Sequence, residues 1–252
     1  GGVVGYAYYT SIHDCYNAGD VLRNSNPSTC YIGGVVGFMQ GSTIANCYNA
    51  GSVNGVANDD GRVFAGGVVG FAENNNTITN CYNTGFVYEE GDSSCAGGVV
   101  GFAEEDNAIT NCYNTSAVTG TGIVGGVVGW AERSNKVTDC YNTGDVSGID
   151  TNDSVGGVLG VSGFFSYDYR SDVINCYNIG AVTGTGEIGG VVGCAYKYCG
   201  IINCYNIGAV TGTGEGGGVV GYAYSSTITN NYYGGNCTLS YGIGSSSSNT
   251  GA

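Results

Sequence analysis

Cysteine is the residue whose type and spacing most directly suggest chemistry in this sequence. The chain has 252 residues and 12 cysteines. Seven of them recur every 28 to 36 residues, each preceded by asparagine or aspartate and followed by tyrosine. They are Cys15, Cys47, Cys81, Cys112, Cys140, Cys176 and Cys204. Repeated thiols can form disulfides, bind a metal ion or pack as small apolar groups.

Acidic side chains are the second group that could do chemistry. The chain carries 20 Asp and Glu against 6 Lys and Arg, which gives a net charge of -14. Two acidic stretches offer hard oxygen ligands for calcium, and the candidate ligands are Asp59, Asp60, Asp150 and Asp153. Neither stretch has the ligand spacing of an EF-hand, so the alternative is that these carboxylates only keep the surface soluble.

The same residue counts disfavour several classes of function. A single histidine, His13, makes a catalytic triad or a histidine-rich metal site hard to build. The acidic residues, among them Glu104 and Asp106, fall in variable loops of unrelated register, whereas polysaccharide-cleaving sites need carboxylates that converge. The negative charge opposes nucleic acid, and no apolar stretch is long enough for membrane insertion. We therefore expect no enzyme activity, no catalytic residue and no cofactor apart from the calcium considered above.

All of these residues follow an internal repeat. The block Gly-Gly-Val-Val-Gly, once with leucine for its second valine, begins at Gly1, Gly33, Gly66, Gly97, Gly125, Gly156, Gly189 and Gly217. A second block, Ile-x-Asn-Cys-Tyr-Asn-x-Gly-x-Val, follows it with small variations. Neither block has the apolar spacing of a helix, and both are β-branched or aromatic runs bounded by glycine and asparagine. The repeat therefore predicts short strands joined by tight turns.

A unit of strands and turns alone cannot bury its apolar face and must stack on its neighbours. The sequence thus predicts an all-β fold, a β-solenoid (parallel β-helix) of eight coils of about 28–36 residues. We assign residues 1–252 to one solenoid domain, in which residues 236–252 form a Ser- and Gly-rich end of the array. A β-propeller is the alternative, but each of its blades needs about 40 residues.

In a solenoid each repeated residue forms a column along the axis. The predicted tyrosine ladder consists of Tyr16, Tyr48, Tyr82, Tyr113, Tyr141, Tyr177, Tyr205 and Tyr232. The columns through Ile44 and Val53 are expected in the core, and the aromatic column through Phe71 and Trp130 is expected in the core or flanking a sheet. Glycine four residues after the cysteine, such as Gly85, is expected at a corner that requires positive φ or no side chain.

Stacking at about 4.8 Å would allow a disulfide between successive ladder cysteines. Each sulfur would then have two equivalent neighbours and seven sulfurs cannot all pair, so we expect a reduced, buried thiol ladder. Outside the ladder, Cys194 and Cys199 are a candidate disulfide if the compartment is oxidising. Zinc bound by these two and Cys204 is disfavoured by their spacing and by the lack of a nearby histidine. The asparagine or aspartate before each ladder cysteine is expected in a turn, and an asparagine there can bond through its amide to the next coil.

Residues 66–72 and 78–85 read Gly-Gly-Val-Val-Gly-Phe-Ala and Ile-Thr-Asn-Cys-Tyr-Asn-Thr-Gly. This repeat resembles the GLUG motif family of bacterial surface proteins, and the resemblance extends over essentially the whole chain. It implies an extracellular or cell-surface location in adhesin-like proteins, or a place beside the catalytic parts of some immunoglobulin A peptidases. The motif brings no catalytic residues with it.

The repeat favours a non-catalytic structural and interaction module of a bacterial surface or secreted protein: an adhesin stalk, a spacer or a self-assembling filament subunit. Its expected partners are other copies joined end to end, or flanking domains of a longer protein. The alternative is a module that binds glycans or proteins, at a host or cell surface, through an exposed tyrosine ladder. That alternative gains weight if Tyr82 and Tyr113 point outward. A β-helix enzyme acting on polysaccharides is the third and least favoured hypothesis.

Overall fold

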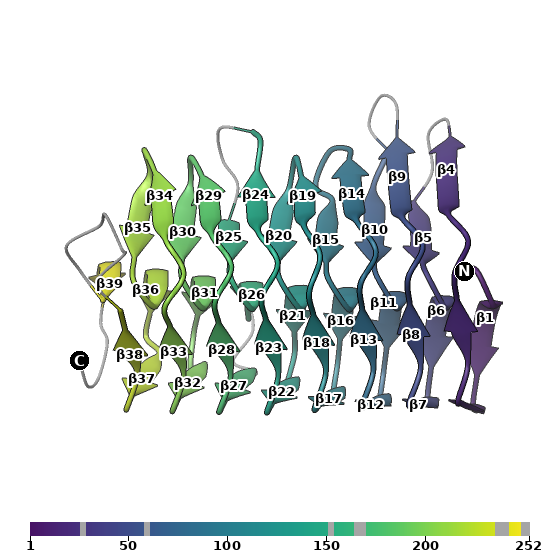
Figure 1. The fold of residues 1–252 in the computed structure, drawn as a ribbon. Helices are drawn as coiled ribbons and strands as arrows, with labels where there is room; N and C mark the ends of the chain where they lie inside the picture. The colour runs from purple at the N-terminus through teal and green to yellow at the C-terminus, as the bar shows by residue number, and fades with distance from the viewer. Residues whose placement is uncertain (26–28, 58–60, 151–153, 164–169, 235–241, 248–252) are drawn as a thin grey trace.

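The chain forms a rod-like β-solenoid (Figure 1). The computed structural model describes residues 1–25, 29–57, 61–150, 154–163, 170–234 and 242–247. These described residues contain no helix, and so none that is long and apolar enough to cross a membrane. Successive coils lie side by side from the N-terminal to the C-terminal end of the rod. The predicted all-β parallel solenoid is confirmed.

Each coil contributes short strands to five parallel sheets, A to E, in which equivalent residues of successive coils pair in register. Within the described residues sheet A has nine strands, sheets B and C have eight each, and sheets D and E have seven each, in rough agreement with eight coils.

Sheet A contains β1 (Val4–Tyr8), β6 (Val36–Gln40), β11 (Val69–Glu73), β16 (Val100–Glu104), β21 (Val128–Glu132), β26 (Leu159–Ser162), β31 (Val192–Tyr196), β36 (Val220–Tyr224) and β39 (Ile243–Ser247). Sheet B contains β2 (Ser11–His13), β7 (Thr43–Ala45), β12 (Thr77–Thr79), β17 (Ala108–Thr110), β22 (Lys136–Thr138), β27 (Asp172–Ile174), β32 (Gly200–Ile202) and β37 (Thr227–Thr229). Sheet C contains β3 (Tyr16–Asn17), β8 (Tyr48–Asn49), β13 (Tyr82–Asn83), β18 (Tyr113–Asn114), β23 (Tyr141–Asn142), β28 (Tyr177–Asn178), β33 (Tyr205–Asn206) and β38 (Tyr232–Tyr233). Sheet D contains β4 (Val21–Ser25), β9 (Val53–Ala57), β14 (Val87–Glu90), β19 (Val118–Gly120), β24 (Val146–Gly148), β29 (Val182–Gly184) and β34 (Val210–Gly212). Sheet E contains β5 (Cys30–Gly33), β10 (Val63–Gly66), β15 (Cys95–Gly97), β20 (Ile123–Gly125), β25 (Ser154–Gly156), β30 (Glu187–Gly189) and β35 (Glu215–Gly217).

The rod has two cores rather than one. The larger core lies inside sheets A and B and includes the column through Ile44 and Ile78 together with the ladder cysteines. The smaller core lies between sheets D and E and includes the column through Val53 and Val87. Both aliphatic columns are buried, as expected from their apolar character. In Figure 1 sheets D and E form the upper part of the rod, and sheets A, B and C form the lower part.

A ladder of asparagines runs along sheet C, half-buried at Asn17 in the first coil and fully buried at the other members. Its members are Asn17, Asn49, Asn83, Asn114, Asn142, Asn178 and Asn206. The amide of Asn83 donates to the Asn114 side chain at 2.9 Å and to the Gly85 carbonyl at 2.6 Å, while its oxygen accepts from the Asn49 amide at 2.8 Å. A Cβ on Gly67, the second glycine of its block, would lie 2.4 Å from Asn83 Cγ. The same Cβ would lie 2.1 Å from the Gly98 carbonyl oxygen in the next coil, so close stacking and the ladder together explain why that position is glycine.

The turns differ from expectation in where the left-handed backbone falls. The glycines after the cysteine, such as Gly85, are not left-handed, but a Cβ on Gly85 would lie 1.9 Å from the carbonyl oxygen of Gly51 in the neighbouring coil. Close stacking, not backbone conformation, thus requires glycine there. In this turn the left-handed residue is the asparagine or aspartate before the cysteine, such as Asn80 with φ of 53°. The Asn80 amide donates to Asn46 Oδ1 at 3.2 Å, which forms the exposed amide ladder that the sequence predicts.

Glu89 is a carboxylic acid buried between sheets D and E. Its register partners in the adjacent coils are Gly55 and Gly120, so its side chain occupies space that those coils leave to glycine. Thr121 Oγ1 donates to Glu89 Oε1 at 3.3 Å, whereas Oε2 has no hydrogen-bond partner among the described residues. Burial is the main cause that raises the pKa of Glu89 from 4.5 to about 8.

Because the folded state holds the Glu89 proton more tightly than the unfolded state, the neutral acid stabilises the fold below pH 4.5. This stability is lost as the pH rises towards about 8, the pKa in the folded state. We expect Glu89→Gln to remove this loss, because glutamine does not titrate. The free energies of unfolding of wild type and variant should then diverge by up to about 1.4 kcal/mol per pH unit within that window. Urea unfolding at several pH values measures the difference. The exposed Glu90→Gln is the matched control, and an equal effect of both substitutions would contradict the prediction.

Candidate functional site

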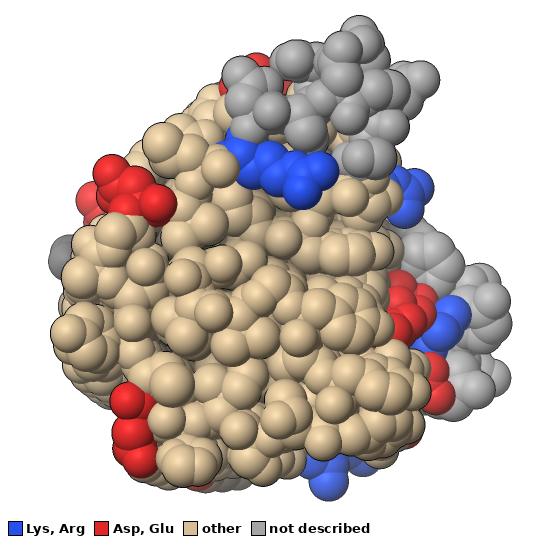
Figure 2. Space-filling model, turned by 90° about the vertical axis from the view of Figure 1, so that its right-hand side faces the viewer, with Lys and Arg blue, Asp and Glu red and all other residues tan. Residues whose placement is uncertain are grey.

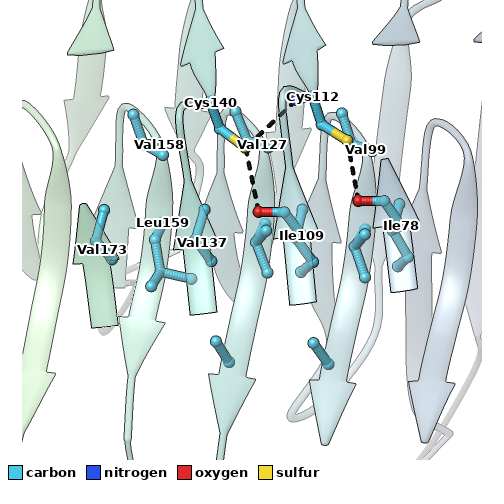
Figure 3. Packing of buried hydrophobic residues seen from close by; sticks show 14 of the residues in the cluster. Ile78, Val99, Ile109, Cys112, Val127, Val137, Cys140, Val158, Leu159 and Val173 are labelled. Atoms are coloured by element: carbon cyan, nitrogen blue, oxygen red, sulfur yellow. Dashed lines mark hydrogen bonds between the residues drawn. The ribbon is translucent and has the colours of Figure 1, made fainter. Parts of the chain in front are cut away.

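The ladder cysteines form a column of thiols in the larger core (Figure 3). The thiol of Cys112 donates to the Ile78 carbonyl at 3.6 Å and that of Cys140 to the Ile109 carbonyl at 3.5 Å. All cysteines described by the structure are free, and those of the ladder are buried except the half-buried Cys15. Burial raises the pKa of Cys176, whereas hydrogen bonds with neighbouring thiols lower the pKa of Cys81, so the shifts differ in sign along the column. Burial keeps the thiols from Cys47 to Cys204 away from solvent. The column therefore packs and bonds to backbone, with no access for a reactant.

The candidate disulfide between Cys194 and Cys199 is not formed, and both residues are free thiols. Cys194 lies on the outer face of sheet A, in register with Val161 and Tyr222. Cys199 belongs to the larger core and donates to the Tyr196 carbonyl at 2.9 Å. Cys194 faces outward from β31, whereas Cys199 lies after the end of that strand and points into the larger core, and proximity in sequence could not reveal this.

The calcium candidates are not assembled into a site by the described part of the chain. Asp59, Asp60 and Asp153 lie outside the described residues. Asp150 is exposed, and its backbone carbonyl accepts a hydrogen bond from Thr185 at 2.5 Å. Among the described residues no three His, Cys, Asp or Glu side chains are grouped to hold a metal ion. Calcium binding thus stays a hypothesis from the sequence.

The tyrosine ladder forms a continuous outward stripe on sheet C. Ring centroids of successive tyrosines lie 4.8 to 5.1 Å apart from Tyr16 to Tyr205, and their planes are within 7° of parallel. Tyr82 and Tyr113 point outward, since each is half-buried while the following asparagine is fully buried. Stacking covers the ring faces, however. A partner would therefore meet ring edges and hydroxyl groups, not flat aromatic faces.

The aromatic column of sheet A lies outside both cores. It packs in the angle between the outer faces of sheets A and E, where Phe71 and Phe102 of sheet A meet Phe64 of sheet E. The rings of Phe71 and Phe102 stack at 5.0 Å, and Phe102 stacks on Trp130 at 5.0 Å. The column is thus a satellite aromatic cluster that joins two sheets from the outside.

A ladder of carboxylates runs beside the aromatic column. Glu73, Glu104 and Glu132 pair in register on sheet A, two residues beyond the aromatic position. The expectation that Glu104 lies in a loop of unrelated register is therefore wrong. The signal was present in the sequence, because each of these glutamates stands seven residues after the first glycine of its block.

Arg133 forms ion pairs with two members of this ladder, Glu104 and Glu132. Its Nη1 lies 2.7 Å from Glu104 Oε1, and its Nε lies 3.4 Å from Glu132 Oε1. Partial burial is the main cause that raises the pKa of both Glu104 and Glu132, and the charge of Arg133 opposes the shift. Since the arginine bridges the two carboxylates, they form an ion-pair cluster of fixed geometry.

These elements border an open groove with a volume of about 650 Å³. Its walls include Arg62, Phe64, Phe102, Glu104, Trp130 and Arg133. This groove combines aromatic rings with charged groups in a hollow of ligand size. Reasoning from the sequence missed it, because its two walls come from different sheets.

Together, the in-register sheets and ladders define a non-globular class of protein, the repeat-built parallel β-solenoid. Comparison with family models adds that residues 1–22 match the GLUG motif. The resemblance to GLUG repeats is thereby confirmed in the first coil, and the equivalent strands of the second coil pair in register with it. No curated protein and no solved structure matches the chain.

Proposed function

We propose that the chain is a non-catalytic repeat module that serves as a rigid spacer or stalk in an extracellular or cell-surface protein of a bacterium. The observation that carries this proposal is the unbroken register of the asparagine and tyrosine ladders along the rod. Each coil makes the same bonds to the next, so the rod's length is set by the number of coils and its stiffness by the ladders. The GLUG motif in residues 1–22 supports the surface location.

The first coil supports a second part of the proposal, which concerns partners. At this end of the rod Val3, Tyr6, Tyr16 and Leu22 are 45, 62, 60 and 70% exposed. Figure 2 shows this end face, on which charged side chains lie towards the rim. Its strands β1 to β4 pair with one neighbour each among the described residues. A further coil, from a flanking domain or a second copy, would cover these apolar groups and unpaired strand edges.

A binding module that uses the tyrosine ladder is the second candidate. The outward stripe through Tyr82 and Tyr113 favours it, and the covered ring faces restrict it to partners that recognise ring edges and hydroxyl groups.

Deletion of whole coils tests the spacer. Removing residues 66–124 joins Ala65 to Gly125, which preserves the register because Gly66, Gly97 and Gly125 are paired positions. We expect a folded rod shortened by two inter-strand spacings, roughly 10 Å, in small-angle X-ray scattering. Removing residues 66–110 is the control, because it joins Ala65 to Asn111 out of register and should prevent folding. Labelling of intact cells with an antibody tests location, and an epitope accessible only after lysis would contradict a surface role.

A further inference from the structure

The groove between the outer faces of sheets A and E has the composition of a ligand site that the spacer role does not use. We propose that it binds a neutral oligosaccharide lying along the rod. This goes beyond the proposed function, because a rod could act as a spacer with a featureless surface. The volume of about 650 Å³ is within the usual size of a small-molecule site.

The apolar part of the groove is built from rings. Phe64 of β10 and Phe102 of β16 lie with centroids 5.1 Å apart across the angle between the two sheets, and both are nearly buried. Trp130 of β21 continues the wall by stacking on Phe102, and its indole N–H donates to the Gly163 carbonyl at 3.0 Å. That bond fixes the orientation of the indole. Because Phe64 and Phe102 are nearly buried, the half-buried Trp130 supplies the accessible ring edge, which the apolar C–H groups of a pyranose ring can contact.

The polar part of the groove supplies both acceptors and donors. Glu104 and Glu132 are charge-assisted acceptors for hydroxyl groups, and Arg133 is a donor. The side chains of Glu104 and Arg133 are 24 and 29% exposed, so they are accessible while their mutual contact at 2.7 Å holds them in place. Groups fixed before binding lose little conformational entropy when a ligand arrives. The set therefore matches a ligand that is rich in hydroxyl groups and has an apolar face.

Two other ligand classes fit the groove poorly. An extended peptide binds a sheet by pairing with a free strand edge, but the strands of sheets A and E that form these walls are paired on both sides. An anionic glycan would gain no net attraction in the groove, because Glu104 and Glu132 balance the charges of Arg62 and Arg133 in its walls. Glu73, next in register to Glu104, and the net charge of -14 on the chain would oppose its approach. A neutral saccharide avoids both obstacles.

The tryptophan provides the test, because Trp130 is the one tryptophan of the chain and lies in the groove wall. The full chain is titrated with cello-, malto- and chito-oligosaccharides, and with hyaluronan oligosaccharides as the anionic comparison. We expect a saturable change of tryptophan fluorescence with at least one neutral probe and a much weaker response to hyaluronan. Absence of any response to all neutral probes, together with no heat of binding in calorimetry, overturns the proposal.

Variants locate the binding. Glu132→Gln and Glu104→Gln keep the side-chain shape and the reporter, and each should weaken binding about tenfold by loss of one charge-assisted hydrogen bond. Glu90→Gln makes the same change at an exposed residue of sheet D, outside the groove, and should leave the affinity unchanged. Thermal unfolding of each variant verifies that it is folded. If Tyr113→Ser weakens binding while the glutamate variants do not, the saccharide site is the tyrosine ladder and the groove proposal is wrong. Neither result affects the coil-deletion test of the spacer.

Discussion

Replacing Asn83 by aspartate should lower the free energy of unfolding by on the order of 3 to 5 kcal/mol at neutral pH. The side chain is fully buried and makes bonds to both neighbouring asparagines. A carboxylate keeps the acceptor towards Asn49 but has no hydrogen to donate to Asn114 or to the Gly85 carbonyl. The Asn114 side-chain oxygen and the Gly85 carbonyl oxygen, both acceptors, would then lie against a buried negative charge without a donor between them. Chemical unfolding of the variant measures the loss.

The control lies three residues earlier in the same coil. Asn80 is exposed and donates to Asn46 at 3.2 Å, and the equivalent position in other coils is already aspartate in Asp14 and Asp139. We expect Asn80→Asp to change the stability by less than about 0.5 kcal/mol, as for ordinary surface substitutions. Similar losses for Asn80→Asp and Asn83→Asp would mean that the buried ladder contributes no more than the exposed one.

Replacing Gly101 by alanine should cost about 3 kcal/mol or more, because a methyl group has no room there. A Cβ at Gly101 would lie 2.7 Å from the Gly70 carbonyl oxygen and 2.8 Å from the Ala65 carbonyl oxygen. Both contacts are to backbone, one in the neighbouring coil and one in sheet E, and neither atom can rotate away. Thermal and urea unfolding would report the loss.

Gly5 is the matched control for this substitution. It occupies the same position of the glycine block, but a Cβ there would meet no atom within 4 Å. Gly5→Ala is therefore expected to stay within about 0.5 kcal/mol of the wild type. A large loss at Gly5 would indicate that glycine is needed for backbone conformation, and it would contradict the argument from close stacking.

The fold was largely predictable because the spacing of the repeated blocks indicates the length and stacking of the coils. Equal spacing of the glycine and cysteine blocks predicts coils, and residues such as Ile44 and Val53 could be placed in the core from their apolar character alone. Roles inside the turn were harder to assign. Asn83 and Asn80 are the same residue type three positions apart, yet one is a buried ladder member and the other is an exposed, left-handed turn residue. Sequence spacing does not state which side of the turn faces inward.

The candidate site was not predicted, although part of its pattern was visible. The constant spacing of Glu73, Glu104 and Glu132 from their glycine blocks predicts a ladder once it is counted. The opposite wall could not be found in this way. Phe64 and Phe102 are far apart in the sequence and meet only because sheets A and E fold against each other on their outer faces.

The amino-acid sequence by itself determined the all-β class, the parallel stacking of coils and the columns of equivalent residues, because a short strand-and-turn unit can bury its apolar face only against its own copies. Only the tertiary structure decided how one coil bends. That bend divides the interior into two cores, places the aromatic column outside them, separates Cys194 from Cys199 and brings the walls of the groove together. Contacts between coils join equivalent residues, so the repeat period predicts them. Contacts across a coil join different sheets and depend on the backbone angles at the turns, which the repeat period does not determine.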